Sequence, residues 1–204
     1  MANRLCCIAI YSSFVLVVAC ASAPPAERAN ADGNGAYLSG KFNDALSEYE
    51  QALKLATDSG DKQYAAIAMY GLARTNARLC NVPLAEDWFK KSIAARESLP
   101  DERSAYLTQN LLEFARFLLA QGRVAEGVLL MDRAVPRLEW LGVAGSDPIA
   151  YANFYDDYAV ALREVGRAAD AAAASSRADT LRSHFPDRKA RFKPATYADC
   201  RTRK

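Results

Sequence analysis

Apolar residues along this chain recur every three or four positions, which is the spacing of one face of an α-helix. The clearest runs are Tyr70, Ala73 and Ala77, and Leu111, Phe114 and Leu118. No stretch alternates between apolar and polar residues with the period of two that marks a half-buried strand. Alanine and leucine are abundant and β-branched residues are few, which also favours helices. The pattern predicts an all-α fold.

Turn and capping signals divide the helical part of the chain into four pairs of helices. The predicted pairs are 27–38 with 42–58, 62–79 with 83–98, 102–121 with 124–141, and 148–165 with 168–184. Asp147 and Pro148 mark a helix start, because aspartate caps a helix and proline fits its first turn. Pro136 predicts a kink or a break in the sixth helix. Residues 32–35 predict a weak first helix, and residues 142–145 predict the main loop between pairs.

An internal repeat aligns on the short turn inside each pair. These turns start at Gly40, Cys80, Gly122 and Gly166. A small residue follows each turn start five positions later, and a second, mostly bulky column follows four positions after that. The small column is Ala45, Ala85, Gly127 and Ala171, and the second column is Tyr49, Phe89, Met131 and Ser175. Small residues let two helix axes approach, and bulky residues fill the next gap.

These columns resemble the tetratricopeptide repeat family, whose unit is a helix–turn–helix hairpin. The turns are 40, 42 and 44 residues apart, whereas the usual period of the family is about 34 residues. The longer period is similar to the extended repeats of kinesin light chains. The resemblance implies an α-solenoid of about four such units over residues 26–184. HEAT-like or irregular α-solenoid units are the structural alternative.

The N-terminal residues form a targeting signal rather than part of the fold. An apolar stretch of about 15 residues follows Arg4, shorter than the roughly 20 residues that cross a bilayer as a helix. It ends in Leu16-Val17-Val18-Ala19-Cys20, which resembles the bacterial lipobox. The resemblance implies a lipoprotein signal peptide over residues 1–19, lipid on Cys20, and a tether over residues 20–35.

The residues after Cys20 indicate a location. The two residues directly after Cys20 are Ala21 and Ser22, neither of them an aspartate, a pattern similar to lipoproteins of the outer membrane. The expected location is therefore the bacterial outer membrane, facing the periplasm, with a lipid anchor as the membrane contact. Two alternatives stay open. One is an ordinary signal peptide cleaved near Ala21-Ser22-Ala23, which gives a secreted protein, and the other is a retained inner-membrane anchor.

Cys80 and Cys200 are the two cysteines that remain once the signal peptide and Cys20 are set aside. An even pair in an oxidising compartment is a candidate disulfide. The alternative for Cys80 is a free, small residue buried in its turn. The chain has a single histidine and no Cys-x-x-Cys motif, so no metal site is expected.

The charges are nearly balanced, with 26 Lys and Arg against 24 Asp and Glu and a formal net charge of +2. This balance argues against nucleic-acid binding by the whole chain. No phosphate-binding loop, serine nucleophile motif or zinc motif is present, so neither enzyme activity nor a cofactor is expected. Residues 187–204 hold seven basic and two acidic side chains. This basic C-terminal tail either folds back onto the helices or contacts anionic lipid or an acidic partner.

The family resemblance implies a non-enzymatic scaffold that binds proteins or peptides in a concave groove lined by the first helix of each pair. Arg74 and Arg116 occupy equivalent positions six residues before their turns, and Arg78 lies one helical turn beyond Arg74. Tyr70 adds an aromatic ring one turn before Arg74. Because a guanidinium suits carboxylates, these four residues are the candidate groove site. The alternative is that the arginines pair with acids such as Glu113 and only solvate the surface.

The resemblance implies a setting in the envelope, because similar lipoproteins serve either in secretion or pilus assembly or as adaptors for cell-wall hydrolases. A self-associating structural protein, in which the ends of the solenoid stack between copies, is the alternative, followed by a helical enzyme. The molecular mass in solution at several concentrations distinguishes self-association from a monomeric scaffold.

Overall fold

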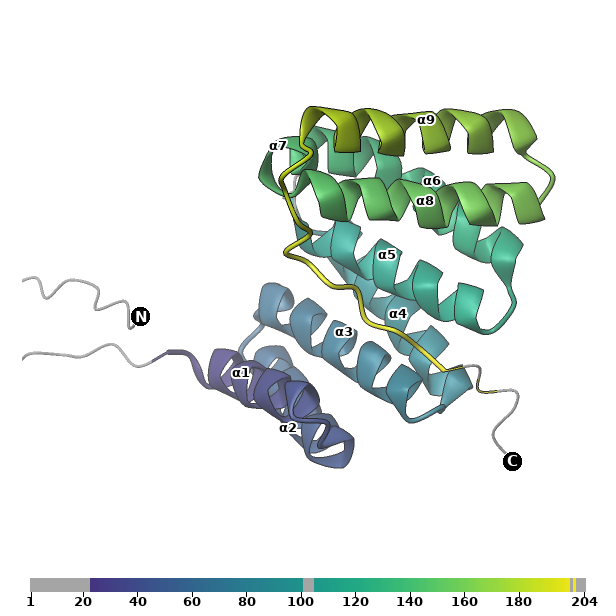
Figure 1. Ribbon diagram of the computed structural model, residues 1–204. Helices are drawn as coiled ribbons and strands as arrows, with labels where there is room; N and C mark the ends of the chain where they lie inside the picture. Colours follow the sequence, from purple (N-terminus) through teal and green to yellow (C-terminus); the bar gives the residue numbers. More distant parts are fainter. Residues whose placement is uncertain (1–22, 101–104, 199, 201–204) are drawn as a thin grey trace, which may run out of the picture.

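The computed structural model describes residues 23–100, 105–198 and 200. Within these residues the chain forms nine helices and no strand (Figure 1): α1 Pro25–Leu38, α2 Phe42–Asp58, α3 Lys62–Arg78, α4 Val82–Glu97, α5 Ala105–Ala120, α6 Val124–Trp140, α7 Val143–Ser146, α8 Pro148–Glu164 and α9 Ala168–His184. Wherever the structure describes a predicted helix end, the two differ by at most two residues. The signal peptide 1–19 and the lipidation site Cys20 lie outside the described residues.

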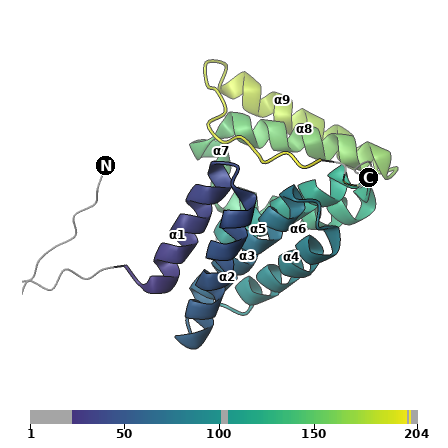
Figure 2. The same ribbon diagram turned by 90° about the horizontal axis from the view of Figure 1, so that it is seen from below.

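The eight long helices form four hairpins: α1 with α2, α3 with α4, α5 with α6, and α8 with α9. Successive hairpins stack, because α2 packs against α3, α4 against α5, and α6 against α8. The first helices also touch, α1 against α3 and α3 against α5. Seen from below, the hairpins follow one another in a curved stack (Figure 2). The prediction of an all-α solenoid of four helix–turn–helix units is confirmed.

The repeat columns read from the sequence form the contacts between helices. The small column is buried at all four positions, Ala45, Ala85, Gly127 and Ala171. The second column is also buried in the first three units, at Tyr49, Phe89 and Met131, whereas Ser175 in the last unit is partly exposed. Among the described residues no further hairpin packs on α9. The side chain at position 175 therefore has no gap to fill, and a small serine is sufficient there.

The four turns inside the hairpins share one backbone geometry. Their first residues have left-handed φ angles: 74° at Gly40, 62° at Cys80, 73° at Gly122 and 80° at Gly166. In each turn the N–H of the following residue bonds the carbonyl five positions back, as in Asn81 N–H to Asn76 O at 2.9 Å. This is the Schellman closure of a helix, which glycine makes without strain. Cys80 is the one non-glycine residue of the described chain with a positive φ.

Helix α1 is continuous, in contrast to the weak helix and the tether expected from the sequence. Residues 25–35 are helical, which agrees with the helix predicted at 27–38 and differs from the tether assigned to residues 20–35. Gly33 explains the difference, because a Cβ at this position would lie 2.8 Å from the ring of the buried Tyr49. The glycine therefore lets α1 approach α2 closely, and the packing gained offsets its low helix propensity.

Two expectations about the third and fourth hairpins also differ from the structure. Helix α6 runs from Val124 to Trp140 without a break at Pro136. The buried Met131, Ala134 and Leu138 pack on both sides of the proline and offset the lost backbone hydrogen bond. The loop expected at 142–145 contains the single-turn helix α7.

Candidate functional site

The C-terminal tail, residues 185–198 and Cys200, crosses the groove that the sequence assigned to a partner. It leaves the end of α9, passes α7 and runs over the first helices α8, α5 and α3 (Figures 1 and 2). The choice left open by the sequence is therefore resolved for these residues, which fold back onto the helices.

The first part of the tail is bound at the start of α8. The side chains of Arg188 and Arg191 donate to the carbonyl of Ser146. The backbone N–H groups of Arg191 and Phe192 donate to the Asp147 carboxylate, at 3.1 and 2.9 Å from Oδ2. Asp147 also accepts the N–H of Ala150 at 3.3 Å, so it caps α8 and holds the tail with one carboxylate.

The end of the tail is bound through its backbone by side chains of α3 and of the α5–α6 turn. Arg78 Nη1 donates to the Thr196 carbonyl at 2.7 Å. Gln121 uses both ends of its amide: Nε2 donates to the Ala198 carbonyl at 2.9 Å, and Oε1 accepts the Cys200 N–H at 3.0 Å. These bonds recognise an extended backbone rather than particular side chains.

Tyr197 provides the main side-chain contact of the tail. Its ring packs edge-on against Phe117, with 5.7 Å between the ring centroids. Its hydroxyl donates to Glu113, a carboxylate whose exposed fraction is only 4%. Burial and the Glu113 charge raise the pKa of Tyr197 well above its usual value, so the phenol stays protonated and remains a donor.

Cys80 and Cys200 form a disulfide in the structure, with the sulfur atoms 2.13 Å and the Cα atoms 5.4 Å apart. The bond fixes the end of the tail to the turn between α3 and α4. Both cysteines are partly exposed, so Cys80 is not the free, buried residue of the alternative interpretation.

Arg74 lies in the interface between the first two hairpins instead of pointing freely into the groove. Its guanidinium stacks on Tyr37, with Cζ 4.0 Å from the ring centroid. It also donates to the hydroxyl of Tyr49 at 2.6 Å and to the side chain of Asn34. Helices α1, α2 and α3 are thereby tied together, and we expect Arg74→Ala to destabilise the fold rather than to act on binding alone.

Tyr70 is also part of the packed interior. Its side chain is buried, and its ring centroid lies 5.4 Å from Cζ of Arg74. Burial, with the charge of Glu113 as the next contribution, raises the pKa of the Tyr70 hydroxyl, and this hydroxyl has no hydrogen-bond partner among the described residues. The residue therefore forms the floor of the groove and is not an exposed aromatic platform.

Arg78 and Arg116 are the two candidate residues that the structure brings to the tail. Besides its bond to Thr196, Arg78 stacks on Phe42 at 5.2 Å. Arg116 Nη1 lies 3.8 Å from Glu113 Oε1, and its guanidinium lies 5.9 Å from the ring centroid of Phe192. The pairing with Glu113 considered from the sequence is thus present at Arg116. The same carboxylate also accepts the Tyr197 hydroxyl, and Phe192 lies beside the guanidinium.

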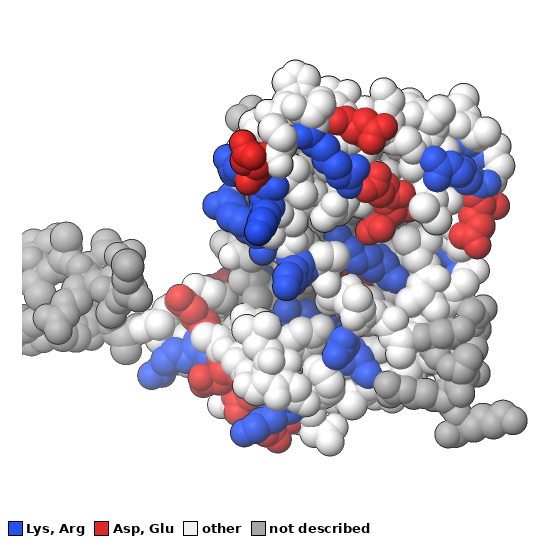
Figure 3. All heavy atoms as spheres, in the orientation of Figure 1, with Lys and Arg blue, Asp and Glu red and all other residues white. Residues whose placement is uncertain are grey.

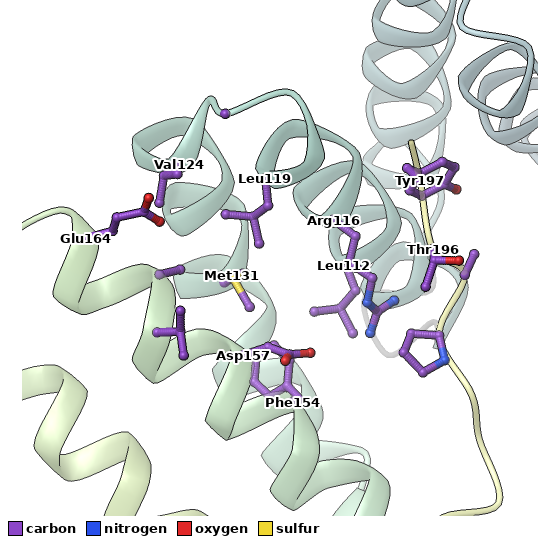
Figure 4. Close-up of a pocket in the computed structure, with 15 residues that line it drawn as sticks. Leu112, Arg116, Leu119, Val124, Met131, Phe154, Asp157, Glu164, Thr196 and Tyr197 are labelled. Carbon is purple, nitrogen blue, oxygen red and sulfur yellow. The ribbon is translucent and has the colours of Figure 1, made fainter. Parts of the chain in front are cut away.

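An open pocket of about 450 Å³ lies beside the tail, between α5, α6 and α8. Leu112, Leu119, Met131 and Phe154 line it, and tail residues 194–197 form one wall (Figure 4). Arg116 enters from α5 and Asp157 from α8. The pocket offers space for an apolar side chain between charges of opposite sign. In Figure 3, Lys and Arg side chains gather around the hollow on this face.

Asp157 is a pocket residue that sequence reasoning did not select. Partial burial raises the pKa of its carboxyl group, against the smaller lowering by Arg116. Gln121 and the tail contacts of Asp147 were missed as well. A pattern of helical faces contains no signal for them, because their partners lie 44 to 79 residues away in the sequence.

The described part of the chain contains no group of three or more His, Cys, Asp or Glu side chains placed to hold a metal. None of its helices is both long and apolar enough to cross a bilayer.

Residues 27–98 match the tetratricopeptide repeat family. Among solved structures, BtubC (BKLC) from P. vanneervenii is similar over 84% of this chain and 68% of its own, with 17% sequence identity and a TM-score of 0.70. The MamA protein matches over 85% of this chain and 100% of its own, with 12% identity and a TM-score of 0.45. No curated protein matches the sequence. The similarity to BtubC supports the helical fold of the chain, and the family match covers its first two hairpins.

The double role of Asp147 leads to a pH-dependent prediction. Burial acts to raise the pKa of this carboxyl group, but the N–H groups of Phe192, Ala150 and Arg191 and the Arg191 charge lower it below its usual value. A carboxylate with a lowered folded pKa stabilises above the unfolded value of about 3.9, and this stabilisation is lost as the pH falls through the folded pKa. We expect Asp147→Ala to lower the free energy of unfolding by about 1–2 kcal/mol at pH 7, with the difference shrinking below about pH 4.

Urea unfolding between pH 3 and pH 7 measures this difference. Asp61→Ala is the matched control, because Asp61 caps α3 through the N–H groups of Gln63 and Tyr64 and makes no bond to the tail. Trypsin is expected to cleave after Arg191 faster in the Asp147 variant than in the wild type, because the bonds to the N–H groups of Arg191 and Phe192 are lost. The Asp61 variant should be cleaved at the wild-type rate. Equal cleavage in the two variants would show that Asp147 does not hold the tail.

Proposed function

We propose that this protein is a non-enzymatic scaffold, anchored by lipid to the outer membrane and facing the periplasm, that binds an extended segment of another envelope protein on its concave surface. The tetratricopeptide repeat fold supports the scaffold role. The lipobox resemblance at residues 16–20 supports the anchor and the location. At that location the scaffold would serve the assembly of envelope machinery, such as a secretion or pilus complex.

The observation that carries the proposal is the extended tail in the groove. Arg78, Gln121 and Asp147 bind the tail through its backbone groups, which every extended peptide presents. The pocket beside residues 194–197 adds a site for an apolar side chain. A surface with these two features suits an extended peptide segment, because it offers partners for backbone groups and space for a side chain.

The proposed anchor places the solenoid close to the membrane. Helix α1 begins at Pro25, five residues after Cys20. Five extended residues span at most about 18 Å, so lipid on Cys20 would hold the first hairpin near the headgroups. Cys20→Ser is expected to move the protein from the membrane fraction to the soluble fraction, and mass spectrometry should find acyl chains on Cys20. A mature protein that starts at Ala21 or later and carries no acyl chain would refute the anchor.

Photocrosslinking tests the binding surface without disturbing the core. A photoreactive phenylalanine replaces Val160, which lines the pocket and has an exposed fraction of 59%. The matched control replaces Leu129 on α6, which has an exposed fraction of 63% and does not line the pocket. We expect a distinct crosslinked partner from position 160 and none of it from position 129.

Each other outcome has a defined meaning. Equal yields from both positions, or no product from position 160 in either the oxidised or the reduced protein, would contradict binding in the groove. A product that contains a second copy of this chain would favour the self-associating alternative.

A further inference from the structure

The tail is held covalently at both of its ends, and between them by hydrogen bonds and by the packing of Tyr197 on Phe117. It continues from α9 at His184 and is fixed by the disulfide at Cys200. Residues 191–194 are exposed, and the contacts along the tail are mainly single hydrogen bonds. Such bonds contribute about 1 kcal/mol each in water-exposed positions. The disulfide adds a covalent restraint to these contacts and holds the end of the tail that carries Tyr197.

The groove under the tail is built from buried polar groups that point toward it. With the tail in place, Glu113 and Gln121 have exposed fractions of 4% and 5%, and both bond it. The tail thus covers polar groups whose hydrogen bonds it satisfies, and another extended segment with the same donors and acceptors could satisfy them in its place. Glu113 receives a phenol hydroxyl, and Gln121 receives one carbonyl and one N–H of an extended backbone.

At the start of α8, where the tail first meets the groove, the chain presents acceptors for basic side chains. The Ser146 carbonyl accepts from Arg188 and Arg191, and Asp147 lies next to it. Together, Ser146, Asp147, Glu113 and Gln121 match an extended segment with basic residues at its start and a tyrosine near its end. Arg78, which binds the Thr196 carbonyl, completes this surface, called here the tail site.

We propose that the tail site is a binding surface for an extended, basic and tyrosine-containing segment of a partner protein, and that the Cys80–Cys200 disulfide determines whether the tail or the partner occupies it. This inference rests on the proposed function and adds the partner's chemistry and its regulation. With the disulfide closed, the tail keeps a high effective concentration at the tail site. With the disulfide open, the end that carries Tyr197 is free to leave.

Opening requires a dithiol reductant, such as the reduced form of a thiol–disulfide oxidoreductase. A thiolate of the reductant attacks one sulfur of the pair and forms a mixed disulfide, and the other cysteine leaves as a thiolate that takes up a proton. The second thiol of the reductant then attacks the mixed disulfide. The reductant ends as a disulfide, and this chain ends with two thiols. The partial exposure of Cys80 and Cys200 permits this attack.

The test uses a fluorescein-labelled peptide of residues 186–198 as the probe and the full mature chain as the receptor. Anisotropy measures binding to three forms: the oxidised protein, the protein reduced with dithiothreitol, and Cys200→Ser. We expect the two open forms to bind the probe at least about tenfold more tightly than the oxidised form. If Cys200→Ser folds poorly, the reduced wild-type protein serves as the open form, because it has the native sequence.

Changes in the probe and the receptor then test the individual contacts. A probe with phenylalanine in place of Tyr197 lacks the hydroxyl that Glu113 accepts and is expected to bind several-fold more weakly. Gln121→Ala in the Cys200→Ser background is expected to weaken the probe similarly. Arg133→Gln is the control, because Arg133 pairs with Glu97 at an exposed site and makes no bond to the tail.

Equal probe binding by oxidised and open forms, or no binding by the open forms, would overturn the proposal. A Cys200→Ser protein that forms oligomers dissociated by the probe would assign the tail site to a second copy of the chain instead of a partner. Crosslinking from position 160 distinguishes failure of this inference from failure of the proposed function. If the oxidised and the reduced protein capture the same partner in equal yield, the scaffold role is supported and control by the disulfide is refuted.

Discussion

Replacing Cys200 with alanine is expected to lower the free energy of unfolding of the oxidised protein by about 2–4 kcal/mol. The disulfide joins residues 120 positions apart, so the unfolded chain loses much conformational freedom when the bond is closed. The variant also releases the end of the tail, with its contacts to Gln121 and Glu113. Thermal and urea unfolding, with and without dithiothreitol, measure the difference.

Variants at Cys80 separate the bond from the backbone of the turn. Cys80 has a φ of 62°, a conformation that costs a residue with a Cβ about 1–2 kcal/mol. Cys80→Ala should have the same free energy of unfolding as Cys200→Ala, because both lose the disulfide. Cys80→Gly should be about 1 kcal/mol more stable than Cys80→Ala, because glycine adopts this φ without strain. Reduced wild-type protein should unfold like Cys200→Ala. An unchanged melting temperature on reduction, or two free thiols in the denatured, unreduced protein, would contradict the bond.

Gly71→Ala is expected to destabilise the fold by about 1–3 kcal/mol or more. A Cβ at Gly71 would lie 2.3 Å from Cε1 of Tyr49, a contact that real structures do not contain. Tyr49 is fully buried and its hydroxyl bonds Asn34 and Arg74, so the ring has little room to move. The added methyl group should separate α2 from α3 and disturb the interface that Arg74 holds.

Gly35→Ala provides the matched control for this substitution. Gly35 is exposed on α1, and a Cβ there would meet no atom within 4 Å. Alanine is a better helix former than glycine by about 1 kcal/mol, so this variant should be more stable than the wild type. Chemical unfolding of the two variants should thus give changes of opposite sign. A stabilised Gly71→Ala would show that the hairpins tolerate more space between them.

The sequence determined the repeat because its signals are local. A left-handed turn residue, a small residue five positions later and a bulky residue four positions after that act within one hairpin and its nearest neighbour. The main contacts between hairpins join adjacent hairpins, so a short-range pattern is sufficient for the fold. The expectations of a weak helix around Gly33 and of a break at Pro136 were wrong, because helix propensity does not include the packing that offsets it.

The roles of the groove residues were decided by tertiary structure. Arg74 and Arg116 occupy equivalent repeat positions, yet Arg74 ties α1 to α2 and α3 while Arg116 lies beside Glu113 and the tail. The repeat register places both arginines on the same face of their helices. It does not show which residues surround each of them. Those neighbours depend on the path of the tail, which is fixed by Asp147, Gln121 and the disulfide between residues 120 positions apart. Periodicity does not encode contacts at that separation, because they arise only when the stacked hairpins bring distant residues together.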